Sequence, residues 1–150
     1  MTVRFERSVF IDAAIDRVFA LSLSVDFHLD SFADTGEQVV GGVRTGMMAL
    51  GDEVTWRAKH FGIWWELTSV ITEFDPPYFF VDEQQRGPFS SYRHEHIFVS
   101  HGTGTEMRDV VEFRAPLGPL GVIAERLVLR RHLEDLIDLR NEELRTIAEA

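Results

Sequence analysis

The stretch VIAERLVLRRHLEDLIDLRNEELRTI, residues 122–147, contains neither glycine nor proline and carries one apolar stripe. The stripe repeats every three or four residues, which is the period of one helix face. It consists of Leu129, Leu133, Leu136, Leu144 and Ile147, with Arg140 in its one gap. The glycines and proline within residues 117–121 are predicted to set the start of this helix. A helix of this length spans about 39 Å, so its apolar stripe needs a partner surface of similar length.

The opposite face of the predicted helix is charged and is expected to meet water. It carries Arg131, Glu134, Asp135, Asp138, Glu142 and Arg145. The helix should therefore lie on the surface of the protein, with one side packed against the rest of the chain.

The chain before this helix has the pattern of an antiparallel sheet. Alternating apolar and polar residues, bounded by Gly, Pro and Asp, predict strands over residues 3–11, 38–43, 53–61, 63–74, 78–85, 89–99 and 105–115. Two short helices are predicted between the first two strands, over 14–22 and 27–32, with Asp12 and Asp26 as N-caps. Because short turns join most of the strands, neighbours in sequence should pair antiparallel.

The bulk composition limits the classes of function. The 150 residues are expected to form a single domain, 1–150, with its own core. The formal net charge of −10 argues against nucleic acid or an anionic membrane as a partner. No apolar run approaches about 18 residues, so no membrane span is expected. The absence of cysteine and of a signal-peptide pattern predicts a cytoplasmic location.

The order of the predicted elements resembles the helix-grip fold of the START and pollen-allergen (SRPBCC) superfamily. Several segments are similar to bacterial polyketide cyclase/dehydrase-type members: VTWRAKHFG at 54–62, FVDEQ at 80–84, GPF at 87–89, YRHEHIF at 92–98, GT at 104–105, RD at 108–109 and FRAPLG at 113–118. Tyr92 stands where such relatives usually have tryptophan, and Ala14 replaces the usual proline of the first helix. The resemblance implies an α+β fold in which a curved antiparallel sheet of about seven strands wraps around a long C-terminal helix. It also implies a cavity between the sheet and that helix.

The strand 89–99 carries two histidines on the face that should line this cavity. Its alternation sets Tyr92, His94, His96 and Phe98 on one side of the sheet. On the next strand the same alternation turns Asp109 inward, where a facing imidazole is the natural partner for a carboxylate among apolar neighbours. The cavity is therefore expected to be lined by Trp56, His60, Phe80, Asp82, Gln84, Tyr92, His94, His96, Phe98, Met107, Asp109, Phe113, Leu133 and Leu136.

Three functions fit this pattern. The first is binding of a small, largely apolar molecule, with His94, His96 and Asp109 orienting its polar end. The second is a cyclase or dehydratase that acts on a polyketide-like carbonyl compound, in which the same three residues are the catalytic candidates. The third is a protein-interaction role with a filled interior, in which the histidines and Asp109 only order the sheet.

No cofactor and no metal are expected. Two histidines on one strand face, with a carboxylate on the next strand, could ligate a metal as in cupins. However, a long C-terminal helix does not belong to the double-stranded β-barrel of that class. Trp64 and Trp65 point to opposite faces of one strand, so one of them should be partly exposed, at the cavity mouth or in a homodimer contact. The expected partner is a small hydrophobic molecule, and a homodimer is an open alternative.

Overall fold

The computed structural model describes the backbone of residues 2–115 and 122–150, and the side chains of these residues except 122–125. The elements follow in the order β1 (Val3–Ile11), α1 (Ile15–Leu23), α2 (Val25–Ser31), the short 3-10 helix η1 (Ala33–Thr35), β2 (Gln38–Gly42), β3 (Glu53–His60), β4 (Ile63–Asp75), β5 (Phe79–Arg86), β6 (Ser91–His101), β7 (Gly104–Arg114) and α3 (Val122–Glu149). Apart from η1, which the sequence analysis did not predict, this is the order that the sequence predicts. Residues 117–121, predicted to set the start of α3, lie outside the described residues.

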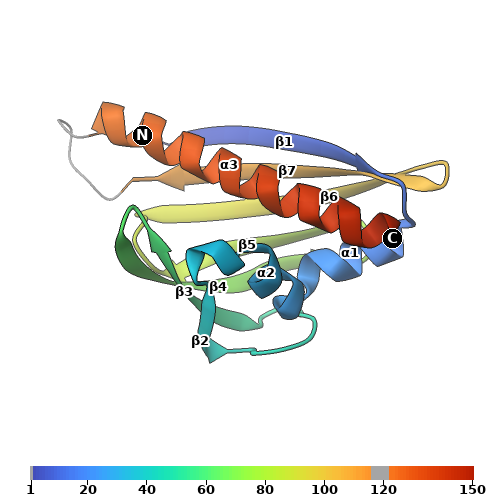
Figure 1. Cartoon of the computed structure of the whole chain (residues 1–150), viewed down its shortest axis with the longest axis horizontal. Helices are drawn as coiled ribbons and strands as arrows, with labels where there is room; N and C mark the ends of the chain where they lie inside the picture. The colour runs from blue at the N-terminus through green and yellow to red at the C-terminus, as the bar shows by residue number, and fades with distance from the viewer. Residues whose placement is uncertain (1, 116–121) are drawn as a thin grey trace.

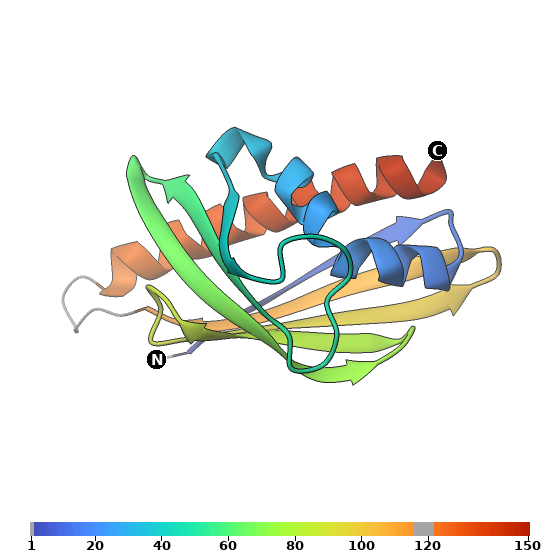
Figure 2. The same cartoon turned by 90° about the horizontal axis from the view of Figure 1, so that it is seen from below.

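The seven described strands form one antiparallel sheet in the spatial order β1-β7-β6-β5-β4-β3-β2. The strands from β2 to β7 are neighbours in sequence as well as in space, and β1 closes onto β7 with Val3 opposite Phe113. Register shifts in β4 beside Thr68 and beside Ile71 insert bulges, which bend a sheet. Figure 2 shows the sheet curving around α3. The predicted helix-grip fold is confirmed.

The long helix α3 crosses the concave face of the sheet, and its C-terminal end lies beside α1 (Figure 1). Arg17 of α1 donates hydrogen bonds to the carbonyl oxygens of Ala148 and Ile147, both at 3.0 Å. These carbonyls lack partners within the helix because they belong to its last turn. Leu144 and Ala148 also share a core cluster with Phe19 of α1. These contacts hold the C-terminal end of α3 against α1. None of the described helices is long and apolar enough to cross a membrane.

The two aspartates predicted to cap the short helices are not the caps. α1 has Ala14 at its N-cap, without a side-chain hydrogen bond. α2 is capped by Ser24, whose hydroxyl oxygen accepts a hydrogen bond from the backbone N–H of Phe27. Asp26 instead accepts a hydrogen bond from the backbone N–H of Gly46 at 2.9 Å. Ser and Asp cap helices about equally well, so the local pattern could not decide between two candidates that lie two residues apart.

Candidate functional site

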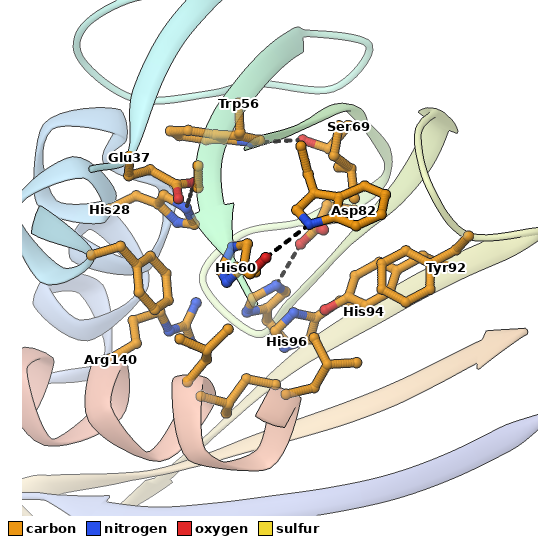
Figure 3. Close-up of a pocket in the computed structure, with 18 of the residues that line it drawn as sticks. His28, Glu37, Trp56, His60, Ser69, Asp82, Tyr92, His94, His96 and Arg140 are labelled. Carbon is orange, nitrogen blue, oxygen red and sulfur yellow. Dashed lines mark hydrogen bonds and ion pairs between the residues drawn. The ribbon is translucent and has the colours of Figure 1, made fainter. Parts of the chain in front are cut away.

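A cavity of about 560 Å³ lies between the concave side of the sheet and α3. Apolar side chains form most of its wall, and polar side chains gather at a few positions (Figure 3). The predicted residues that line it are Trp56, His60, Phe80, Asp82, Tyr92, His94, His96, Leu133 and Leu136. The sheet and the helix thus bring together residues from β3, β5, β6 and α3.

Five other predicted residues are absent from the described lining of this cavity: Gln84, Phe98, Met107, Asp109 and Phe113. Phe98 and Met107 belong to the core cluster that includes α1, and Phe113 to a second cluster with Ile137 of α3. Gln84 bonds the backbone of Phe89 through both atoms of its side-chain amide, at 2.8 and 3.1 Å. Strand alternation predicts the face of Phe98, Met107 and Phe113 correctly, but core side chains cover all three. An inward direction alone therefore does not bring a residue to the cavity.

Asp109 lies behind the cavity wall as the centre of a buried polar network. Its Oδ1 accepts from Nε2 of His94 at 2.7 Å and from Nη2 of Arg140 at 3.1 Å, while its Oδ2 accepts from Nδ2 of Asn141 at 2.7 Å. The carboxylate has no exposure to solvent, and such a group is tolerated only when charged and hydrogen-bonded partners compensate its burial. Burial by itself would raise the pKa of Asp109, but the Arg140 guanidinium and the His94 hydrogen bond hold it below its usual value. Asp109 is therefore a carboxylate at neutral pH.

The ionised Asp109 determines the tautomer of His94. A carboxylate accepts hydrogen bonds and cannot donate them, so Nε2 of His94 carries a proton. In the neutral ring Nδ1 is then the acceptor, and among the described residues nothing is bonded to it. Since His94 lines the cavity, this nitrogen is available to a bound molecule.

His96 forms a second histidine–carboxylate pair. Its Nε2 lies 2.7 Å from Oδ2 of Asp82, which is on the neighbouring strand β5 (Figure 3). Burial, and then the proximity of His94, lower the pKa of His96 to about 4. Burial opposes ionisation of Asp82, but the hydrogen bond from His96 and the proximity of His94 lower its pKa. At neutral pH this pair is therefore a neutral imidazole that donates to a carboxylate.

The two histidines are stacked, which bears on metal binding. The ring centroids of His94 and His96 are 3.8 Å apart at 23°, and Phe80 stacks on the other face of His96 at 4.0 Å and 12°. Candidate ligand atoms of Asp82, His94 and His96 lie within 4.8 Å of one another. An imidazole nitrogen binds a metal ion that lies in the plane of the ring. The rings of His94 and His96 are stacked and nearly parallel, so one ion cannot lie in both ring planes. The arrangement does not fit a shared metal.

Comparison with known families identifies the chain. The sequence profile described as "Polyketide cyclase / dehydrase and lipid transport" matches residues 2–149. The chain belongs to this family. No curated protein matches its sequence.

Proteins of several kinds have solved structures that share the fold of this polyketide cyclase/dehydrase family member. The protein TTHA0849 from Thermus thermophilus has a TM-score of 0.73 and 19% identity, with 99% of each chain covered. The Zhui aromatase/cyclase from Streptomyces sp. R1128 has a TM-score of 0.70 and 18% identity, over 98% of this chain and 96% of that one. The di-domain aromatase/cyclase StfQ of the steffimycin biosynthetic pathway has a TM-score of 0.76 and 16% identity, over 99% of this chain and 52% of that one. At these identities the likeness concerns the fold.

Arg140 is the main functional candidate of this family member that the sequence analysis missed. The sequence placed Arg140 in the gap of the apolar stripe without giving it a role, and in the structure Arg140 is 5% exposed and lines the cavity. Its Nε and Nη2 donate to Oδ1 of Asn141, and Nη2 also reaches Asp109. The signal was present, because Arg140 fills the one gap in the apolar stripe of its helix.

A further polar group in the cavity wall comes from α2 and the segment after it. Nε2 of His28 lies 3.2 Å from Oε1 of Glu37, and the His28 ring packs on Trp56 at 4.0 Å (Figure 3). The indole N–H of Trp56 donates to Ser69 at 3.2 Å. No periodicity of the sequence points to these two residues, because His28 lies in a helix of only seven residues and Glu37 in the irregular segment before β2.

Proposed function

We propose that this protein binds a small, largely apolar molecule in the cavity between the sheet and α3. The observation that supports this best is the buried guanidinium of Arg140 at the cavity wall, whose Nη1 has no partner among the described residues. Nη1 is not among the described side-chain atoms that are both buried and unpaired, so it can be reached from the cavity, where an oxygen at the polar end of a ligand could accept a hydrogen bond from it. The family description, which includes lipid transport, agrees with such a role.

The polar end of the ligand would contact Arg140, Asp82, His94 and His96, which together offer a cation, an anion and a free imidazole nitrogen. Tyr92 adds a phenol that keeps its proton, since burial and the charge of Asp82 raise its pKa. Apolar contacts would supply the affinity: burying about 300 Å² of apolar surface contributes about 7 kcal/mol before the costs of association.

A variant that fills the cavity tests this proposal. Leu136→Trp puts a larger side chain into the lining, whereas Leu139→Trp is the matched control, because Leu139 is on the same helix and 51% exposed. The neutral probe N-phenyl-1-naphthylamine brightens in apolar sites, and its affinity should fall about tenfold or more in Leu136→Trp alone. Native mass spectrometry of the purified protein would show a copurified molecule directly. Equal affinity in the two variants would overturn the proposal.

A second function, catalysis in the same cavity, is favoured by the pairing of His94 with Asp109. Nδ1 of His94 could accept a proton from the carbon next to a ligand carbonyl, while Asp109 orients the ring. The negative charge that then develops on the carbonyl oxygen would be stabilised by Arg140. This is the first step that a cyclase or dehydratase acting on a polyketide-like compound requires.

Deuterium exchange separates binding from catalysis. If His94 acts as a base, the wild-type protein should accelerate loss of deuterium from the carbon next to the carbonyl of 2-tetralone, followed by NMR. His94→Gln should abolish the acceleration and still bind the ketone. Binding without acceleration in the wild type would leave binding alone as the function. The cytoplasmic location and the homodimer stay predictions.

A further inference from the structure

The cavity is unusually rich in histidine. Five of the six histidines of the chain line it: His28, His60, His94, His96 and His132. Two of these contact each other, since Nδ1 of His60 lies 2.9 Å from Nε2 of His132 and the rings are nearly perpendicular, at 80°. His60 ends β3 and His132 belongs to α3. The contact therefore joins the sheet to the helix across the cavity.

The His60–His132 contact lies where the cavity meets solvent. The lining residues next to it are exposed, with Phe61 at 55% and Val128 at 54%. The ring of Phe61 packs on His132 with centroids 4.6 Å apart, and Trp65 donates from its indole to the backbone oxygen of His60 at 3.1 Å. We call this region, formed by His60, Phe61, Trp65, Val128 and His132, the cavity mouth.

The hydrogen bond at the cavity mouth depends on protonation. When both imidazoles are neutral, the N–H of one ring donates to the unprotonated nitrogen of the other. If one ring gains a proton it still donates to the neutral ring, so the hydrogen bond remains. When both rings are protonated each nitrogen is a donor, so the bond is lost and two like charges face each other. Two rings in such contact titrate as a coupled pair.

The groups around the pair keep it neutral at neutral pH. Burial lowers the pKa of His60, against the opposing charge of Glu37, which itself contacts His28. Burial and the proximity of His60 lower the pKa of His132, against the opposing charge of Asp135 on its own helix. The doubly protonated state is therefore reached only below the usual histidine range.

We propose that the His60–His132 hydrogen bond is a clasp across the cavity mouth that opens on acidification and so speeds the entry and release of a ligand. This rests on the proposed function, that a small molecule occupies the cavity. Elsewhere α3 is tied to β1 by Arg7, to β7 through Asp109 and to α1 by Arg17. Opening at the mouth therefore leaves the helix anchored on its other side.

Stopped-flow uptake of N-phenyl-1-naphthylamine tests the clasp, because this probe is uncharged throughout the pH range used. Each protein is compared with itself at about pH 7.5 and about pH 4.5, the lower value lying well below the ordinary histidine pKa because both rings must be protonated to break the bond. The wild-type association rate constant should rise about fivefold on acidification, the effect of losing one hydrogen bond. His132→Gln can still pair with His60 but does not titrate, so its rate should change less than about twofold. His101→Gln, which alters an exposed histidine paired with Glu106, should behave as the wild type.

The outcomes separate the clasp from the binding function. Normal uptake with equal wild-type rates at the two pH values, or an equally large rise in His132→Gln, would overturn the clasp alone. If none of the proteins takes up the probe, the proposed binding function is overturned, and the clasp is overturned with it. NMR titration of the histidine side chains adds a readout that needs no ligand: coupled titration below the ordinary value supports the clasp. Independent titration of His60 and His132 at the ordinary value would overturn it.

Discussion

The guanidinium of Arg140 and the carboxylate of Asp109 meet at 3.1 Å inside the fold, although 31 positions separate them in the sequence. Their side chains are 6% and 0% exposed. The pair joins α3 to β7, and His94 bonds the same carboxylate oxygen as Arg140. One ion pair thus links the packing of the long helix to the candidate chemistry of the cavity.

Removing one partner of this pair should destabilise the fold more than replacing both. Arg140→Met leaves Asp109 buried and ionised with fewer donors, and should lower the free energy of unfolding by about 3 kcal/mol or more. The double variant Arg140→Met with Asp109→Leu has neither charge, and should recover part of that loss. Urea denaturation measures both. Arg145→Met is the control, since its pair with Glu142 is exposed and should contribute less than about 1 kcal/mol. Strictly additive losses would contradict the coupling.

Stability should fall as the pH is lowered, because of His96. Its pKa is about 4 in the folded protein and 6.5 ordinarily, so between these values the unfolded chain binds a proton that the folded chain does not. The contribution is fully present above the ordinary value and is lost as pH falls toward the folded one, at most about 3 kcal/mol. His96→Gln still offers a donor to Asp82 but does not titrate, so the free energy of unfolding, measured by urea at stepped pH, should fall less steeply in this range. His101→Gln should keep the wild-type slope, and the same slope in all three proteins would refute the assignment.

Arg17 should hold the C-terminal end of α3. Arg17→Met keeps the apolar stem but loses both hydrogen bonds to the last carbonyls of the helix, which should cost about 1 to 2 kcal/mol of unfolding free energy. Amide hydrogen exchange should also quicken over the last turn of α3. Arg131→Met, whose side chain is 81% exposed, is the control for loss of a guanidinium from the surface. Unchanged exchange in Arg17→Met would show that the core contacts of Leu144 and Ala148 are sufficient.

Much of the candidate site could be predicted from alternation on single strands. His94 and His96 point inward because Tyr92 and Phe98 share their face, and all four do so in the structure, where each is at least half-buried. The limit of this reasoning appears at Phe98 and Phe113, which also point inward but lie under core side chains. Burial is decided by what packs on top of a residue, and strand alternation carries no information about that.

The sequence by itself determined the secondary structure and the order of the elements, because helix and strand periods, turn residues and short connections act over a few neighbouring positions. It also marked Arg140 as an interruption in an apolar stripe, without giving a partner for it. Only the tertiary structure decided that Arg140 meets Asp109, that His94 and His96 stack, and that His60 reaches His132 across the cavity. These contacts depend on how far α3 is shifted and rotated over the curved sheet, and that is set by packing between segments distant in the chain.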